Sequence, residues 1–475
     1  MPRLYNGVRL LRTGPSLLNT RKIDMGATPM IVYMMQRGLE VDLSHFARMA
    51  VTLKQGMDEI TESIQTLTGH RINIDSPIQV SNLLFKKLGL KQARRKLTAK
   101  GDESTEEEVL LAIQHEHQAI PKILEYKELS KLKGTYVDPM PRLARKTAFG
   151  EWRMFPNLGM TRVPSGRLNC KEPNLLAFPS RTWRGREIRK GFITKPGWVY
   201  VSVDESQIEV RVCADNCEDE HLTSIYENEE DIYSDFAISA FSLEDTRYQD
   251  KGKWIYPTVD KTEHRFPAKT CVLAAIYDVT GKGLLEQMPI ICIYCRLPLT
   301  ADKEGMRLHG SDTCGQVFAP LWTEEKCEQI LAAFYRRYPG ILQDRRRNHM
   351  RAKMKGYLWD MWGRILHVGA VKSVIPYVQS SALREAGNFP YQSGAQGTIK
   401  LTMAEVQDDL VASRMLGTVV HPLLQIHDEL LFEVREDVAE EWKEHVVNRF
   451  QTCAPLRVPI KAGGVSAATW GDLEK

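Results

Sequence analysis

Apolar residues recur at steps of three and four between residues 46 and 67, which is the spacing of one face of a helix. Asp42 precedes this stripe, where its carboxylate can cap the first turn, and Gly69 follows it, where a helix can end. The stripe consists of Phe46, Met49, Leu53, Met57, Ile60, Ile64 and Leu67. Ser104 and Glu107 form a capping-box pattern ahead of a second apolar run. We therefore predict that the first third of the chain is helical.

Strand patterns appear in two later segments. VYVSVDESQIEVR (199–211) begins with alternating β-branched residues and ends its apolar part at Asp204. LLQIHDELLFEV (423–434) has two apolar runs that flank His427, Asp428 and Glu429, the pattern of a hairpin with acids at its tip. Two strands that deliver acids to one place would suit paired divalent metal ions. The spacing leaves open whether Asp204 and Asp428 meet, and a lone Asp at a strand end is more often a turn or cap residue.

Composition adds little to this picture. A chain of 475 residues can form two or three subdomains, and a net charge of +4 is slight. Any nucleic-acid binding must therefore come from local basic clusters, and each of these is by itself more often a solvated face. The clusters are KQARRKLTAK (91–100), RTWRGREIRK (181–190) and RRRNHMRAKMK (345–355). In the last of them Arg347, Arg351 and Lys355 would share one helix face.

The N-terminal segment and the cysteines indicate which kinds of protein this sequence could encode. No transmembrane run or secretory signal is present. Residues 1–23 contain five basic residues and no acidic residue. This composition predicts a basic arm that touches DNA or is disordered, in preference to a transit peptide. Nine cysteines at irregular intervals favour free thiols and a metal site over a disulfide framework.

Several segments resemble one family in the same order. DESQIE at 204–209 and IHDE at 426–429 resemble motifs A and C of the family A DNA polymerases, the bacterial DNA polymerase I group. Arg265-Phe-Pro-Ala-Lys269, followed by Tyr277, resembles motif B. Further similar segments are 38–42, 72–90, 123–141 and 165–175. The resemblance covers about residues 24–475 apart from one insertion.

The resemblance implies a mixed α+β fold with right-hand polymerase architecture, in which a helical thumb, an antiparallel-sheet palm and helical fingers are combined. The expected division of the chain is a basic arm at 1–23, a thumb-like region and its junction at 24–185, palm at 186–225 and 370–475, and fingers at 226–369 with an insertion at about 288–320.

The resemblance also implies an activity, the template-directed extension of a primer 3′-hydroxyl with dNTPs in DNA replication. Two Mg²⁺ or Mn²⁺ ions would be held by Asp204 and Asp428, with Glu429 as a supporting acid and His427 near the primer end. The expected partners are primer–template DNA, dNTPs and other replication proteins, with no membrane. We expect a monomer.

Motif B must bind the triphosphate. Arg265, Lys269, Leu273 and Tyr277 recur at four-residue steps, so they lie along one face of a helix. Pro267 belongs in a first helical turn, which places Arg265 and Lys269 near the positive end of the helix dipole. In isolation this is an ordinary amphipathic helix with an exposed basic end. With the resemblance, Lys269 is expected to bind phosphate and Tyr277 to stack beside the templating base.

Selectivity is assigned to further residues by the resemblance. Glu209 matches the position that crowds the sugar 2′ carbon, and Arg167 and Gln392 match residues that contact the minor groove of the nascent pair. Gln207 and Tyr233 complete the expected nucleotide site, and Asn174, Arg347 and Arg351 complete the expected DNA contacts.

The chain departs from the family at several of these positions. Glu205 stands where an aromatic residue is usual, Tyr233 replaces a His that reaches the triphosphate, and Leu273 replaces a Phe or Tyr that packs on the sugar. Leu176 and Ala177 replace amide side chains near the primer–template. The resemblance starts directly at the thumb, so no 3′→5′ exonuclease domain is expected. This compact form suggests a phage enzyme that acts in the cytoplasm of a bacterial host.

The insertion has a metal-binding pattern of its own. Cys292, Cys295, His309 and Cys314 have the spacing of a closed tetrahedral site, which predicts one structural Zn²⁺. The alternative is four free residues in a loop. Two other functions remain open: a polymerase-like, zinc-bearing DNA-binding factor without activity, and a two-metal nuclease. The retained acids, Lys269 and Tyr277 argue against the first of these, and motif B has no role in the second.

Overall fold

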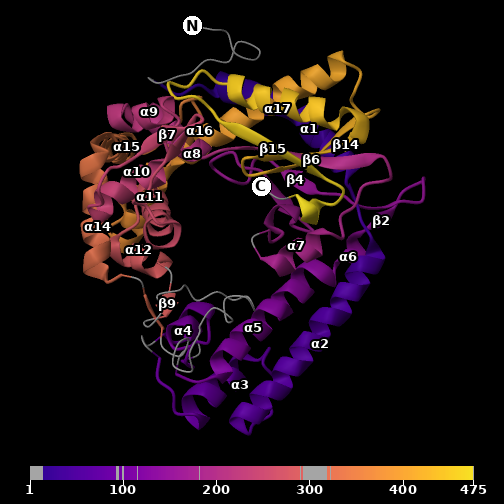
Figure 1. Ribbon diagram of the computed structural model, residues 1–475, viewed down its shortest axis with the longest axis vertical. Coiled ribbons are helices and arrows are strands. Elements are labelled where there is room, and N and C mark those ends of the chain that lie inside the picture. Colours follow the sequence, from indigo (N-terminus) through magenta and orange to yellow (C-terminus); the bar gives the residue numbers. More distant parts are fainter. Residues whose placement is uncertain are drawn as a thin grey trace.

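The computed structural model describes residues 14–92, 96–98, 101–114, 116–180, 182–288, 290–292, 318–320 and 322–473. Helices predominate and the largest sheet has four antiparallel strands, so the fold is the mixed α+β fold that the sequence predicted. Figure 1 shows this sheet and its covering helices at the top, one helical arm on the left and a second at the lower right. These parts correspond to palm, fingers and thumb.

The palm sheet brings together strands from distant parts of the chain. It consists of β6 (Trp198–Glu205), β13 (Val420–Ile426), β14 (Glu429–Arg435) and β15 (Ala462–Ala467) in the order β13-β14-β6-β15. Tyr200, Val201 and Val203 of the central strand β6 are buried, as expected for β-branched and aromatic residues between two covered faces. The antiparallel pairing of β6 with β14 sets the end of β6 beside the turn between β13 and β14.

Two helices from the end of the chain complete this region. They are α16 (Pro376–Ala412), the longest described helix, and α17 (Ala439–Thr452), which packs against α16 and beside β6 and β15. Glycines let α16 approach its neighbours closely, because a Cβ added at Gly397 would lie 2.2 Å from the ring of Trp362. Ala395 and Gln396 in the middle of α16 line one cavity with Glu205 at the end of β6.

The N-terminal segment differs from the prediction of a basic arm over 1–23. Helix α1 (Leu17–Arg37) begins inside that range, and its Asn19 and Ile23 are buried. The helix packs against α16 and β13, so residues 24–37 lie with the palm and not with the thumb to which they were assigned. Charge alone suggested an arm, but the apolar residues at Ile23, Ala27 and Met30 bury one face of a helix.

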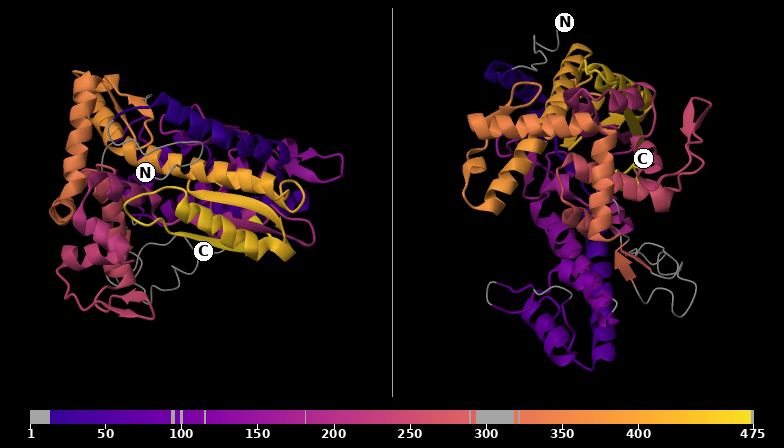
Figure 2. Two further views of the ribbon diagram at one scale, coloured as in Figure 1. Left: turned by 90° about the horizontal axis from the view of Figure 1, so that it is seen from above. Right: turned by 90° about the vertical axis from the view of Figure 1, so that its left-hand side faces the viewer.

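The thumb is built on two long helices, and Figure 2 shows them extending away from the palm sheet. Helix α2 (Leu43–Thr68) is capped by the Asp42 carboxylate, which accepts a 2.8 Å hydrogen bond from the Ser44 amide, and ends at Gly69 in the left-handed conformation. Both ends were predicted. Helix α5 (Ala119–Lys131) packs along it. The smaller thumb helices are α3 (Pro77–Ser81), η2 (Asn82–Lys87), α4 (Glu107–Ala112), η3 (Leu132–Val137) and α6 (Met140–Leu143).

The predicted capping box was wrong, because α4 begins at Glu107 itself and Ser104 lies three residues before that first helical residue. The junction between thumb and palm consists of short strands and helices. They are β1 (Leu39–Glu40), β2 (Arg145–Lys146), β3 (Trp152–Met154), β4 (Asn157–Gly159), β5 (Asn169–Lys171), η4 (Leu175–Ala177) and α7 (Trp183–Arg189).

The fingers surround a second apolar core. The helices around this core are α8 (Ile208–Cys217) and α9 (Glu220–Glu227), which follow the first palm strand, and the fingers helices α10 (Ile232–Phe241), α11 (Phe266–Ile276), α12 (Gly281–Gln287), α14 (Glu324–Arg337) and α15 (Pro339–Lys355). A hairpin of β7 (Tyr248–Asp250) and β8 (Lys253–Ile255) projects from them (Figure 2). A second hairpin, β11 (Tyr357–Trp359) and β12 (Ile365–His367), leads back toward α16.

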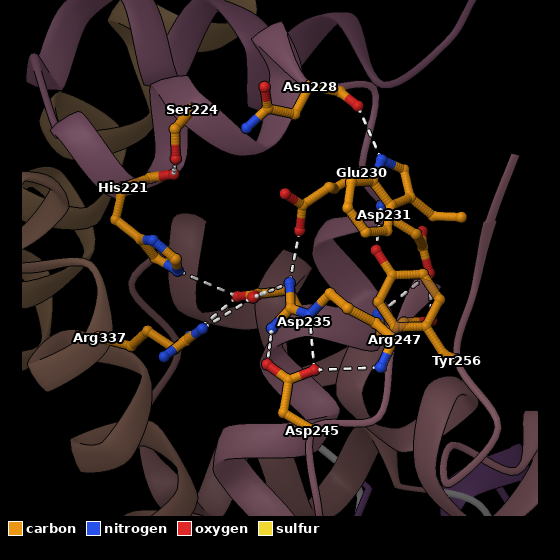
Figure 3. Close-up of polar contacts among 12 residues, drawn as sticks. His221, Ser224, Asn228, Glu230, Asp231, Asp235, Asp245, Arg247, Tyr256 and Arg337 are labelled. Atoms are coloured by element: carbon orange, nitrogen blue, oxygen red, sulfur yellow. Dashed lines mark hydrogen bonds and ion pairs between the residues drawn. The ribbon is translucent and has the colours of Figure 1, made fainter. Parts of the chain in front are cut away.

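A buried carboxylate ties these helices together (Figure 3). Asp235 of α10 is fully buried and accepts hydrogen bonds from Arg337 at 2.8 and 2.7 Å, from Arg247 at 3.0 Å and from Tyr338 at 2.8 Å. Burial acts to raise the pKa of Asp235, but the hydrogen bonds and charge of Arg337 lower it to about 2. The ionised carboxylate therefore holds α10 to α14 and to the segment before β7.

The insertion leaves and rejoins the fingers at one place. β9 (Ile290–Cys292) and β10 (Phe318–Pro320) pair in antiparallel register, with Cys292 opposite Phe318. Cys295, His309 and Cys314 lie outside the described residues, and so does the side chain of Cys292. The predicted zinc site is therefore not tested here. Among the helices in the described ranges, none has the length and apolar character needed to cross a membrane.

Candidate active site

The strand register brings the predicted acids of motifs A and C together. Asp204, at the end of β6, is paired with Glu429, the first residue of β14. Asp428 lies in the adjoining turn, and its carbonyl oxygen accepts a 3.1 Å hydrogen bond from the amide of Glu205. The Glu429 carboxylate also accepts a 2.7 Å hydrogen bond from Ser202. Three carboxylates from two distant segments thus share one edge of the palm sheet.

Two residues at this edge have an uncommon backbone conformation. His427 has φ 56° and Gln207 has φ 58°, both in the left-handed region that non-glycine residues seldom adopt. His427 allows the chain to turn between β13 and β14, and Gln207 allows it to turn from β6 into α8. The strain is therefore located at the two points where the chain presents its acids.

A cavity of about 230 Å³ opens beside these acids. Its lining combines residues from the junction, motif A, the fingers, α16 and motif C. Those predicted from sequence are Arg167, Gln207, Glu209, Tyr233, Leu273, Gln392, His427 and Asp428. Glu205, Ile208, Val210, Ala395 and Gln396 complete the wall. The structure therefore assembles into one cavity most of the residues assigned to the nucleotide site.

Glu205 is the least expected member of this wall. Its side chain is buried, and neither carboxylate oxygen has a hydrogen-bond partner among the described residues. Burial, and then the charges of Asp428 and Asp204, raise its pKa well above the usual range. Burial therefore favours the protonated form of this side chain, unlike that of an ordinary surface glutamate.

The predicted sugar-selecting residue contacts the predicted minor-groove residue. The guanidinium of Arg167 donates a short hydrogen bond to the carboxylate of Glu209, and both line the cavity. Burial raises the pKa of Glu209, the charge of Arg167 lowers it, and Asp428 raises it again. This ion pair joins the junction segment to α8. The two residues predicted to contact the nucleotide sugar (Glu209) and the minor groove (Arg167) therefore contact each other.

Motif B is helical, as the sequence predicted, but the helix begins earlier than Pro267 suggested. η5 (Lys261–Arg265), capped by the Asp260 carboxylate, leads directly into α11, so the free end of the helix lies before Arg265. α11 begins at Phe266 with Pro267 in its first turn, directly after Arg265. The Arg265 guanidinium donates two hydrogen bonds, of 2.8 and 3.0 Å, to the carboxylate of Asp231. Lys269 is exposed one turn further along. Leu273 lines the cavity, whereas Tyr277 ends the helix, where its carbonyl oxygen accepts a 3.2 Å hydrogen bond from Asn388.

Tyr233 links the two cations of motif B. Its ring lies 5.3 Å from the Arg265 guanidinium carbon and 5.6 Å from the Lys269 ammonium, distances suited to cation–π contacts. Burial raises the pKa of Tyr233 to about 12, so it presents a neutral phenol to the cavity. The neutral Tyr233 ring therefore contacts the positive groups of Arg265 and Lys269 and adds no positive charge of its own, as a protonated histidine would.

Asp231 was missed by the sequence analysis. Its carboxylate caps α10 through the amide and hydroxyl of Ser234, at 3.0 and 2.6 Å, while binding Arg265. The hydroxyl of Tyr256 accepts a hydrogen bond from the Asp231 amide. Asp before an apolar helical run is a capping signal that could have located α10, although not its bond to Arg265. Gln396, also missed, carries no signal apart from its place four residues after Gln392.

The basic residues predicted to share one helix face in 345–355 contact other residues of the protein. Arg347 forms a 2.8 Å ion pair with Asp344. The Arg351 guanidinium lies 4.8 Å from the ring of Trp359, and the Lys355 ammonium lies 5.0 Å from it. Asn174, just before η4, is exposed. These residues lie outside the cavity wall, so their contact with DNA stays a prediction.

Comparisons with known proteins agree on one family. Residues 43–472 match the sequence model described as DNA polymerase family A. The chain is 29% identical over 442 residues to a thermostable DNA polymerase I of Thermus filiformis, covering 93% of this chain and 47% of that protein. It is 28% identical over 457 residues to DNA polymerase I of Rhizobium leguminosarum, covering 95% and 40%. The chain thus spans about half the length, or less, of these relatives.

A solved structure has the same fold. It is the polymerase domain of Pol1 from M. smegmatis, in complex with DNA primer-template and dNTP. The TM-score is 0.77 at 24% identity, and the match covers 95% of this chain and 70% of that one.

Proposed function

Because the chain belongs to DNA polymerase family A, we propose that it extends a primer 3′-hydroxyl with dNTPs under the direction of a DNA template. The observation that carries this proposal is the pairing of Asp204 with Glu429, which sets Asp428 beside the cavity lined by motif A, B and C residues. Purified protein with Mg²⁺, dNTPs and a primed template should give full-length, template-complementary products. Binding of DNA without extension would favour a binding factor, and cleavage would favour a nuclease.

The acids at the end of β6 and in the β13–β14 turn suit divalent cations. Carboxylate oxygens are hard ligands, and Asp204 and Asp428 are brought to one edge of the sheet by backbone pairing. We propose that these two residues would hold two Mg²⁺ or Mn²⁺ ions, with Glu429 in support. When bound, such ions neutralise charge on the attacking and leaving oxygens of a phosphoryl transfer.

The remaining cavity residues have binding roles in this proposal. Lys269 attracts the triphosphate, and the Tyr233 ring keeps the Lys269 ammonium close to the cavity. Arg265 reaches the phosphates only in exchange for its contact with Asp231. Arg167 and Gln392 contact the minor groove, where acceptors are shared by all correct pairs.

Glu209→Ala should relax discrimination against ribonucleotides by about 10- to 100-fold, the range expected when a small group is removed from a tight pocket. The reason is that the half-buried Glu209 side chain occupies the cavity wall that would face the sugar 2′ carbon. The measurement is the ratio of kcat/KM for rNTP and dNTP. Glu209→Gln, which keeps the size of the side chain, is the matched control. An unchanged ratio in Glu209→Ala would place the sugar selection elsewhere.

We further propose one structural zinc ion bound by Cys292, Cys295, His309 and Cys314. The pairing of Cys292 with Phe318 supports this, because the insertion then leaves and re-enters the fingers at adjacent points, as a compact unit requires. Four protein ligands would leave no open position for a catalytic water, so the metal would stabilise the insertion.

Protein purified without chelators should contain about one zinc ion per chain by elemental analysis. Replacing Cys292 and Cys295 together by Ser should remove the metal. It should also weaken DNA affinity or processivity more than single-turnover incorporation, because α11 and the palm lie outside the insertion. Wild-type protein without bound zinc would refute the assignment.

We also propose that residues 1–475 carry no 3′→5′ trimming site of their own. The family match accounts for residues 43–472, and the described residues before it form α1 and β1, which pack on the palm and junction. A mismatched primer incubated with Mg²⁺ and the purified chain, without dNTPs, should keep its length. Progressive shortening that follows the protein through purification would contradict this proposal.

A further inference from the structure

Helix α1 lies before residues 43–472, the segment that the family sequence model matches, and hydrogen bonds join it to a turn beside the candidate site. It runs along α16 (Figure 2). Its start contacts the turn at 360–364, where the Ser16 amide donates to the Gly363 carbonyl at 2.9 Å and the Asn19 side chain donates to the Trp362 carbonyl at 3.0 Å. One turn further on, the Asp24 carboxylate accepts a 2.7 Å hydrogen bond from the Arg364 guanidinium.

The turn at 360–364 is itself held firmly. The buried Asp360 carboxylate accepts hydrogen bonds from the amides of Trp362 and Arg364, each at 2.9 Å, and from the Ser393 hydroxyl at 2.6 Å. The Trp362 indole donates to the Gly394 carbonyl at 2.8 Å. Since Ser393 and Gly394 follow Gln392 on α16, this turn and the cavity wall share one rigid support.

Arg364 connects this support to Arg167. A Cβ built on Gly166 would lie 2.8 Å from the Arg364 guanidinium carbon and 2.9 Å from its Nε, so the guanidinium occupies the space beside a glycine backbone with φ 76°. Gly166 is bonded directly to Arg167, whose side chain reaches Glu209 across the cavity. The location of Gly166 therefore depends on where Arg364 is held.

We propose that Asp24 and Arg364 are positioning residues for Arg167. Asp24 fixes the Arg364 guanidinium, Arg364 fixes the backbone at Gly166, and Arg167 is thereby aimed at the minor groove of the primer end. Neither positioning residue lines the cavity. The inference rests on the proposed polymerase activity and on the proposed role of Arg167 in it, and it assigns a function to the helix that precedes the family match.

Asp24 also binds a second cation, and this supplies a matched control. The Lys400 side chain is fully buried, and its ammonium lies 2.6 Å from the same carboxylate oxygen. Lys400→Met removes one partner of Asp24 and leaves the contact between Asp24 and Arg364. Arg364→Met removes the other partner and leaves the contact between Asp24 and Lys400. The two variants perturb the same carboxylate, but only Arg364→Met removes the guanidinium group beside Gly166.

The experiment compares single-nucleotide extension from a primer that ends in guanine with extension from one that ends in 3-deazaguanine. The modified base lacks the minor-groove nitrogen acceptor that Arg167 would contact. Wild type and Lys400→Met should lose about 10-fold in kcat/KM on the modified primer, the cost of one hydrogen bond to a charged group. Arg364→Met should be slower on guanine and nearly indifferent to the modification, as should Arg167→Ala.

Asp24→Asn, made in the Lys400→Met background so that no buried ammonium is left unpaired, should resemble Arg364→Met. A general loss of structure would slow both primers equally and keep the 10-fold ratio, so this ratio separates positioning from stability. Full sensitivity in both Arg364→Met and the Asp24→Asn variant would overturn the inference. If the wild type extends both primers equally well, Arg167 does not contact the minor-groove nitrogen and this inference is wrong. If the wild type extends neither primer, the proposed function is wrong.

Discussion

Alanine at Asp204 or at Asp428 should reduce primer extension by at least about 10³-fold, because each substitution removes a carboxylate that we propose holds the ions that stabilise the transition state. Binding of primer–template should change little, since most of the DNA-facing surface lies elsewhere. Single-turnover extension and DNA affinity, measured on the same preparations, test the two halves of this expectation. Undiminished extension by both variants would refute the site assignment.

Glu205→Gln is the matched control for this experiment. The side chain is adjacent to Asp204, but it is buried, and burial raises its pKa well above the usual range. Because burial favours the protonated form, exchange for a neutral amide of the same size should leave extension within about 10-fold of wild type. A loss as large as that of Asp204→Ala would show that Glu205 acts as an ionised group, and the metal assignment would then have to include it.

Lys269→Ala should lower kcat/KM for dNTPs by about 10²- to 10³-fold, the usual cost of removing one preorganised charge from a transferring phosphoryl group. Lys269 is exposed one turn into α11, beside Tyr233, so its ammonium is free to reach a triphosphate. Arg265→Ala should cost less, because Arg265 is already bound to Asp231. Pre-steady-state incorporation at varied dNTP concentration measures both.

Lys282 offers a comparison for Lys269. It is an exposed lysine in α12, in the same fingers, and it lies outside the cavity wall. Lys282→Ala should leave incorporation within about twofold of wild type, as expected for an isolated surface charge. If Lys269→Ala and Lys282→Ala were equally mild, the triphosphate would have to be bound by other residues.

Local features were predictable because their causes lie within a few residues. The long thumb helix between Asp42 and Gly69 follows from a stripe of apolar residues, a capping carboxylate and a glycine that tolerates positive φ. Pro267 indicated a helix at motif B, although the helical backbone already begins at Lys261. Where local signals conflicted, the prediction failed: the basic residues near the N-terminus suggested an arm, but Asn19 and Ile23 are buried in α1.

The site required more than local pattern. The sequence by itself determined which residues could do the chemistry, since the order of three motifs selected one family and named Asp204, Lys269 and Asp428. Only the tertiary structure decided that Asp204 lies opposite Glu429, because strand register depends on the packing of whole faces against a core. It also decided which charges are available: Arg265 is held by Asp231, and Glu205 is buried without a partner among the described residues. Burial and pairing are properties of the folded surroundings, so a residue's type sets its possible chemistry while its neighbours set its charge and position.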